Sequence, residues 1–245
     1  MGQINPFGFA PESLAKSITE AVELVEASPT HHLDWRHRRE MYKTFGSASD
    51  PTVLKVRGWL AVLSAQYVLP LFEKRPLATL ISDDPNFEGV PRRAIDAAIN
   101  MLHDSADQQV VAYVHNDAYM TFGTWGDGDP SFSMKATTAG FCSYKAMLEV
   151  MGNLEPFALA ESFHKGTKPG LPQDNSRTDW ISGDEFTDTD WAEIAACGDA
   201  AGCAAIAYAC DPNSLDQCDP EKLKAFWTWW LLEAIPKAWA IVVRG

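Results

Sequence analysis

The fold of this chain is decided near its C-terminus, by the stretch Phe226-Trp-Thr-Trp-Trp-Leu-Leu-Glu-Ala-Ile-Pro-Lys-Ala-Trp239. Four of the nine tryptophans of the protein lie in this stretch, which we call the tryptophan helix. Phe226, Trp229 and Leu232 form one apolar face at helical spacing, and a second set forms another, so the helix is expected to be buried on more than one side. The second set consists of Trp227, Trp230, Leu231, Ala234, Ile235 and Ala238.

Acidic cap residues and prolines divide the rest of the chain into further helices. Asp50-Pro51 and Asp219-Pro220 each place an N-cap aspartate directly before a proline, which is favoured at the first helical position. Thr187-Asp-Thr-Asp190 resembles a capping box in front of an alanine-rich segment. Apolar residues at helical spacing predict helices over 11–27, 32–45, 51–71, 91–102, 106–122, 134–151 and 191–210.

The resulting prediction is an all-α chain that forms a single multi-helix domain over 1–245. Alanine-rich helices of similar length would also suit a solenoid-like stack of antiparallel helices. Two long loops, near 123–133 and 164–183, interrupt the helices. No segment alternates like a convincing strand, and 241–243 are expected to form at most a short extended tail.

Composition places the chain among soluble globular proteins. The 245 residues are 46% hydrophobic, and no apolar run approaches the roughly 20 residues that span a bilayer. The start carries no basic segment followed by an apolar core, so we expect no secretory signal and a cytoplasmic location. The five cysteines show no metal-binding spacing and are expected to be buried, reduced thiols.

The charge of −13 is distributed unevenly along the chain. Residues 174–233 contain 13 acidic and three basic residues. A surface this acidic repels nucleic acid and anionic membranes and attracts a basic partner. The alternative is that the charge only keeps the protein soluble.

No motif in the sequence supports catalysis, a metal site or a cofactor. The histidines His31, His32 and His37 lack the spacing of zinc ligands and have arginines as neighbours, which favours surface polar residues. We therefore expect a protein that is not an enzyme. One rival is a helical enzyme with an unrecognised site near His115, Asp127 and Asp129.

Two stretches of this chain resemble a known family. They are Arg57-Gly-Trp-Leu-Ala-Val-Leu-Ser-Ala-Gln-Tyr-Val-Leu-Pro70 and the tryptophan helix itself. Both are similar to stretches of predicted immunity proteins from bacterial polymorphic toxin systems, in particular the mostly α-helical immunity family five. The resemblance implies a protein that binds and neutralises a cognate toxin domain without catalysis. The matching positions have the character of packing residues, so no functional residue carries over.

An acidic segment is the predicted contact for a toxin domain with a basic face. Aromatic residues within it would anchor the partner, whereas in the alternative interpretation its acids only favour the dipole at the start of a helix. A second rival function is a helical scaffold that binds a protein unrelated to toxins, and the sequence indicates no oligomeric state. The predicted contact residues are Trp180, Asp184, Glu185, Asp188, Asp190, Trp191 and Glu193.

Overall fold

The computed structural model describes residues 11–47, 49–74, 87–119, 134–152, 199–211 and 214–244, and within them the all-α prediction is confirmed. A short β-hairpin, β1 (Cys210–Asp211) and β2 (Ser214–Cys218), is the one addition among these residues. The helical elements are α1 (Glu12–Ala27), α2 (Trp35–Thr44), α3 (Pro51–Glu73), the 3-10 turn η2 (Phe87–Gly89), α4 (Val90–Leu102), α5 (Gln108–Ala118), α6 (Met134–Met151), α9 (Ala200–Ala209), α10 (Pro220–Trp229), the π-turn η4 (Trp230–Ala234) and α11 (Ile235–Arg244).

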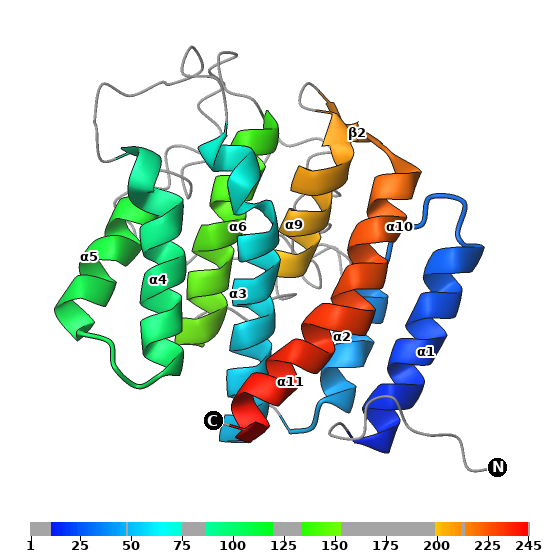
Figure 1. Ribbon diagram of the computed structural model, residues 1–245, viewed down its shortest axis with the longest axis horizontal. Coiled ribbons are helices and arrows are strands. Elements are labelled where there is room, and N and C mark those ends of the chain that lie inside the picture. Colours follow the sequence, from blue (N-terminus) through cyan, green and yellow to red (C-terminus); the bar gives the residue numbers. More distant parts are fainter. Residues whose placement is uncertain are drawn as a thin grey trace, which may run out of the picture.

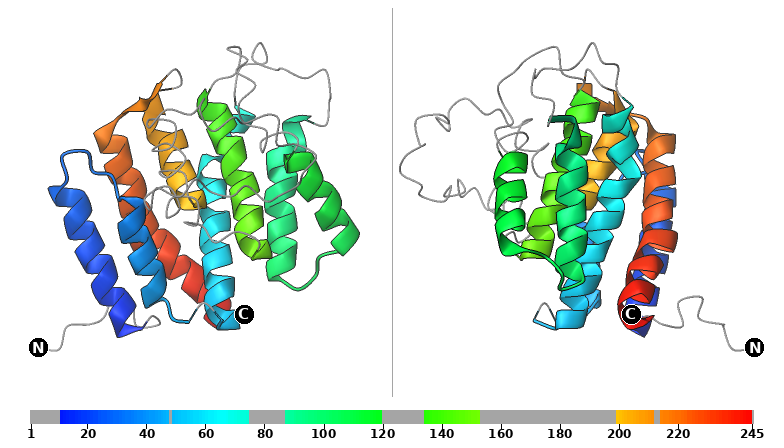
Figure 2. Two further views of the ribbon diagram at one scale, coloured as in Figure 1. Left: turned by 180° about the vertical axis from the view of Figure 1, so that it is seen from behind. Right: turned by 60° about the vertical axis from the view of Figure 1, so that its left-hand side comes forward.

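Helix α3 lies at the centre of the bundle and packs against α4, α6, α9 and α11 (Figure 1). Helix α6 fills the space between α4 and α9, while α5 and α1 lie at opposite edges (Figures 1 and 2). Helix α1 also packs against α10, so a helix from the N-terminal part of the chain lies beside one from the C-terminal part. In a solenoid each repeat contacts only its neighbours in sequence. Here helices that are distant in the sequence contact each other, so the bundle differs from a solenoid.

Aspartate side chains begin several of the helices as the sequence predicts. Asp50 accepts a hydrogen bond from the backbone N–H of Thr52 at 2.8 Å, and Asp219 caps α10 in the same manner. The predicted helix over 191–210 is wrong in one respect, because the backbone of Asp199 is extended (φ −124°, ψ 168°). Helix α9 therefore begins at Ala200, and 191–198 lie outside the described residues.

A glycine in the first family-like stretch allows three helices to approach closely. A Cβ atom on Gly58 of α3 would lie 2.8 Å from Leu102 Cδ2 and 3.1 Å from Val150 Cγ2. Both distances are shorter than ordinary carbon contacts, so a side chain here would force the Leu102 and Val150 side chains to move.

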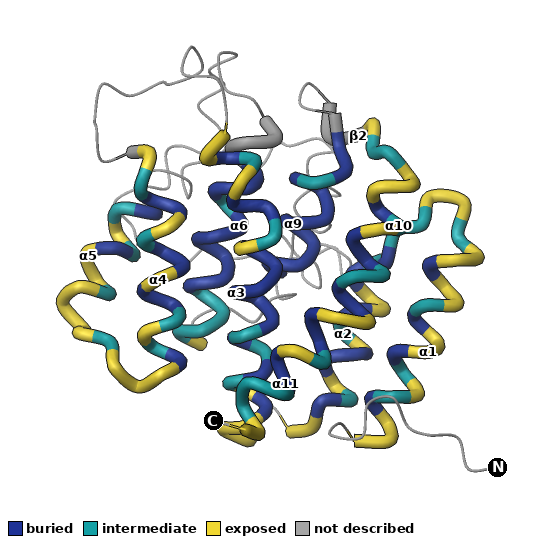
Figure 3. Tube along the Cα trace, in the orientation of Figure 1, coloured by how far each residue is buried: buried dark blue, intermediate teal, exposed yellow. Residues whose placement is uncertain are grey.

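The tryptophan helix is buried on its larger face and on part of its second face. Trp227, Trp230 and Phe226 are fully enclosed, but Leu232 remains 44% exposed, so the expectation of burial on the second face is wrong there (Figure 3). The helix also contains a π-turn, in which the N–H of Ile235 donates to the carbonyl of Trp230. Pro236 explains this turn, because its ring would clash with the carbonyl four residues earlier in a regular α-helix. The expected extended tail at 241–243 is helical instead.

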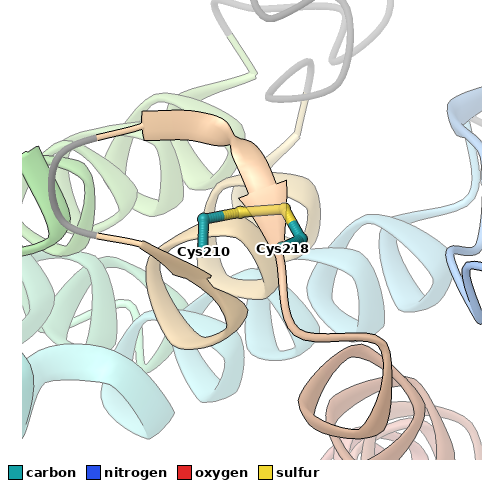
Figure 4. Close-up of a disulfide and its surroundings, with 2 residues drawn as sticks. All are labelled: Cys210 and Cys218. Carbon is teal, nitrogen blue, oxygen red and sulfur yellow. A yellow bond between two sulfur atoms is a disulfide. The ribbon is translucent and has the colours of Figure 1, made fainter.

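Two cysteines form a disulfide, which corrects the expectation of reduced thiols. Cys210 at the end of α9 is bonded to Cys218, directly before α10 (Figure 4). Cys142 and Cys203 are buried, as expected. Within the described ranges no helix is both long and apolar enough to cross a membrane.

Candidate functional site

A cluster of ionisable residues joins α2, α6 and α9, and we call it the inner charged centre. It consists of His32, Arg38, Tyr42, Glu149 and Asp199. Arg38 and Asp199 are both 0% exposed. Arg38 Nε and Nη2 donate to Asp199 Oδ1 at 3.0 and 2.8 Å, and its Nη1 donates to the carbonyl of Leu33 at 2.6 Å. The guanidinium carbon also lies 5.1 Å from the ring centroid of Trp227.

Helical spacing on α2 delivers the arginine to this position. The buried residues of α2 are Trp35, Arg38, Met41 and Tyr42, at spacings of three and four that form one face. Arg38 is therefore the charged member of an otherwise apolar or aromatic face. Burial of a guanidinium requires a counter-charge and filled donor positions, and Asp199 with the Leu33 carbonyl supplies both.

Asp199 has a second role as the N-cap of α9. Its Oδ1 accepts a hydrogen bond from the N–H of Gly202 at 2.9 Å. One carboxylate thus caps the N-terminus of α9 and holds the arginine of α2. Anions are favoured at helix N-termini, so this position suits a carboxylate that also pairs with a guanidinium.

Glu149, in the last turn of α6, reaches the same end of α9. Its Oε1 accepts a hydrogen bond from the N–H of Ala200 at 2.7 Å. Part of the residue stays accessible to solvent, but burial of the carboxyl group raises its pKa to about 8, and the nearby charge of Asp199 adds to this. The positive charges of Arg57 and Lys145 act in the opposite direction. At neutral pH this carboxyl group therefore carries a proton for much of the time.

The remaining two members are held in their neutral forms. Burial, followed by the charge of Asp199, raises the pKa of Tyr42 well above its usual value. Burial and then the charge of Arg38 lower the pKa of His32 to about 4, and its ring packs edge-on against Trp227 at 5.8 Å between centroids. Of the five members of the centre, two thus form an ion pair and three are mainly neutral at pH 7.

This arrangement fixes three helices in register. It also holds the chain at both ends of 153–198, because Glu149 precedes that segment and Asp199 follows it. A groove of about 450 Å³ lies elsewhere, between α1 and α2, and none of its lining residues belongs to the centre. The centre is therefore a polar cluster in the protein interior that connects three helices.

The sequence-predicted contact residues cannot be placed on this frame. Trp180, Asp184, Glu185, Asp188, Asp190, Trp191 and Glu193 all lie outside the described residues, as do Asp127 and Asp129. His115 is on α5, partly accessible, with its ring 5.7 Å from that of Tyr144. Neighbouring Asp117 is paired with Arg93 at 2.7 Å.

The three N-terminal histidines face different surroundings. His31 Nδ1 lies 2.6 Å from the carbonyl oxygen of Val25, His32 packs against Trp227, and His37 lines the groove between α1 and α2. His32 is thus more enclosed than the surface position expected from the sequence. Among the described residues no group of three or more metal-ligating side chains is placed to hold an ion.

Sequence reasoning missed Arg38, Glu149 and Asp199 as a unit. The available signal was the position of Arg38 between Trp35 and Met41 on one helical face. That spacing alone would have separated it from the exposed Arg36.

No protein-family model matches this chain, and no curated protein shows significant similarity to it.

Proposed function

We propose that this protein binds a cognate toxin domain with a basic face and neutralises it without catalysis. The main support is that acidic charge is segregated along the chain. The described residues contain 20 acidic and 16 basic side chains, whereas 153–198 contain nine acidic and three basic ones. A nearly balanced helical frame and an acidic segment together suit recognition of a basic surface, where attraction speeds association.

The inner charged centre supports this proposal through the frame that it holds together. The acidic segment 153–198 begins shortly after Glu149, which accepts the N–H of Ala200, and it ends directly before Asp199. Both attachment points are tied to α9, and Asp199 is also tied to Arg38 of α2. An inhibitor gains affinity when its contact segment is anchored to a rigid frame, because less conformational entropy is lost on binding.

The two stretches that resemble immunity proteins occupy the middle of this frame. Leu60 of the first stretch and Trp227 and Trp230 of the second are fully buried. The stretches contact each other through α3 and η4, so they form one packing unit. The resemblance therefore rests on residues that determine the bundle.

The cytoplasm is the proposed compartment, and the disulfide is an argument against it. Disulfides persist in oxidising compartments and are rare in the cytoplasm. Thiol alkylation of acid-quenched cells, followed by mass spectrometry of the peptides with Cys210 and Cys218, reads the state of this pair. A reduced pair supports the cytoplasm, and an oxidised pair contradicts it.

The first test is a growth assay with the C-terminal domain encoded by the neighbouring reading frame. That domain is expressed with and without this protein, and rescue together with co-purification is the expected result. Toxicity without rescue, or no interaction, would contradict the immunity function and favour a scaffold for another protein.

A charge-reversal pair then tests the acidic segment. Asp188→Lys with Asp190→Lys is expected to slow association with the toxin domain and to flatten its dependence on salt. The matched control is Glu12→Lys with Glu23→Lys on α1, which changes the net charge by the same amount at exposed positions. Equal on-rates for the two double variants would reject the acidic segment as the contact.

A further inference from the structure

Three aromatic rings meet where α3, α9 and α10 come together. Tyr67 of α3 lies 5.2 Å from Tyr208 of α9 and 4.1 Å from Trp229 of α10, measured between ring centroids. Leu232 and Glu233 follow in the π-turn η4, which also contacts α3. We call these five residues the aromatic surface.

A buried ring fixes the positions of the accessible ones. Phe226 is 0% exposed and lies 5.4 Å from Tyr67 and 5.6 Å from Trp229. The three outer rings are half-buried, so part of each ring stays accessible to solvent. Rigid Tyr and Trp side chains of this kind are the usual anchors of protein interfaces, because little entropy is lost when they bind.

Leu232 and Glu233 lie beside the rings, and their exposed side chains contribute little to the stability of the fold. Leu232 is 44% exposed on a face that the sequence pattern predicts to be buried. Its position follows from the π-turn that Pro236 imposes, and π-turns inside α-helices occur frequently at functional sites. An apolar side chain next to open aromatic rings is typical of an interface core.

Charge indicates which partner would fit. Glu233 is exposed and makes no ion pair within the described part of the chain. Burial raises the pKa of Tyr67 to about 12, together with a hydrogen bond to Tyr208 and the nearby charge of Glu233. Glu233 also follows Trp229 by four positions in the continuous helical run of α10 and η4, which places the carboxylate near that ring. Aromatic faces and a carboxylate both attract a cation, and a guanidinium can engage both at once.

We propose that the aromatic surface is a docking site for a protein segment that presents an arginine or lysine beside an apolar side chain. The proposal rests on the proposed function for the identity of that partner, a toxin domain with a basic face. It adds a contact on the described frame that is separate from the acidic segment.

The test uses a random dodecamer peptide library displayed on phage, panned against the full-length protein. The selected peptides are expected to contain arginine or lysine next to a large apolar residue. Their affinity should fall about tenfold or more for Trp229→Ala and about threefold for Glu233→Gln. Leu232→Ser gives a third readout that leaves the ring packing intact. Tyr113→Ala removes an exposed tyrosine on α5, distant from the surface, and should change nothing.

The outcomes separate this proposal from the immunity function. Peptides without basic residues, or no enrichment at all, would overturn the docking site. It would also be overturned if the Leu232→Ser and Glu233→Gln variants bound the peptides as tightly as the wild type does. Specific peptide binding without rescue in the growth assay would retain the site and reject immunity. Rescue in the growth assay, combined with peptides that bind all three variants as tightly as the wild type, would reject the site and retain immunity.

Discussion

The tryptophan helix contributes to two clusters whose charged groups lie in opposite environments, buried in one cluster and exposed in the other. Trp227 lies against the inner charged centre, where Arg38 and Asp199 are fully buried and bonded to each other. Trp229, two residues later, belongs to the aromatic surface, where Glu233 is exposed and makes no ion pair within the described residues. Buried charges must be paired for the protein to fold. Folding places no such demand on an exposed leucine and carboxylate, so the second cluster is the one free to serve binding.

Breaking the inner charged centre should cost the most stability. Arg38→Met leaves Asp199 buried without a counter-charge, and we expect the free energy of unfolding to fall by about 3–5 kcal/mol. Urea denaturation, monitored by circular dichroism, measures this loss. Adding Asp199→Asn removes the uncompensated charge while an amide oxygen still caps α9, so the double variant should recover part of the loss.

Arg92 provides a control that differs mainly in burial. Its guanidinium bonds Glu73 at 2.6 and 2.8 Å, but the two side chains are 57% and 34% exposed. Arg92→Met should therefore cost no more than about 1 kcal/mol. Equal losses for the arginine variants would mean that burial does not distinguish the two pairs.

The next effect concerns the disulfide that joins α9 to α10. Both clusters use residues of these helices, so the bond should stabilise them together. Cys210→Ser with Cys218→Ser opens a loop with a sequence separation of 8 and should lower stability by about 2–3 kcal/mol. Thermal unfolding of the oxidised wild type, the reduced wild type and the double variant measures it. The reduced wild type should match the variant, and a variant as stable as the oxidised protein would contradict the prediction.

An effect that is smaller per pH unit comes from the proton on Glu149. Its folded pKa of about 8 is above the ordinary value of 4.5, so the folded state binds more protons between these limits. Stability should therefore fall as pH rises through this window, by up to about 1.4 kcal/mol per pH unit. Glu149→Gln should remove that slope, because its amide oxygen can still accept the Ala200 N–H.

The titration of His32 determines the pH range in which the Glu149 contribution to stability should be measured. Its folded pKa of about 4 is below the ordinary 6.5, so the unfolded state binds more protons and stability rises with pH over that interval. Above pH 6.5 the His32 contribution fades within about one pH unit, whereas the Glu149 contribution continues to about pH 8. Urea midpoints compared across this range for wild type and Glu149→Gln test it, and identical slopes would show that Glu149 is ionised throughout.

Local signals predicted the helices, and long-range partners could not be predicted. Asp50-Pro51 and Asp219-Pro220 begin helices where expected, because a cap acts within a few residues. Arg38 and Asp199 are separated by 161 positions, and no spacing rule connects them. The same limit explains Leu232, since periodicity assigns a residue to a face without showing whether another element covers that face. Pro236 was the visible signal of the π-turn.

The aromatic surface should be the cluster whose variants disturb folding least. Leu232→Ser and Glu233→Gln change exposed side chains, so each should alter the free energy of unfolding by no more than about 0.5 kcal/mol. The same urea experiment that detects the Arg38→Met loss gives this value directly. If these variants fold with wild-type stability and still lose peptide binding, the exposed cluster is specified by recognition. A loss above about 1 kcal/mol would assign Leu232 to the core and remove the reason for treating the surface as a docking site.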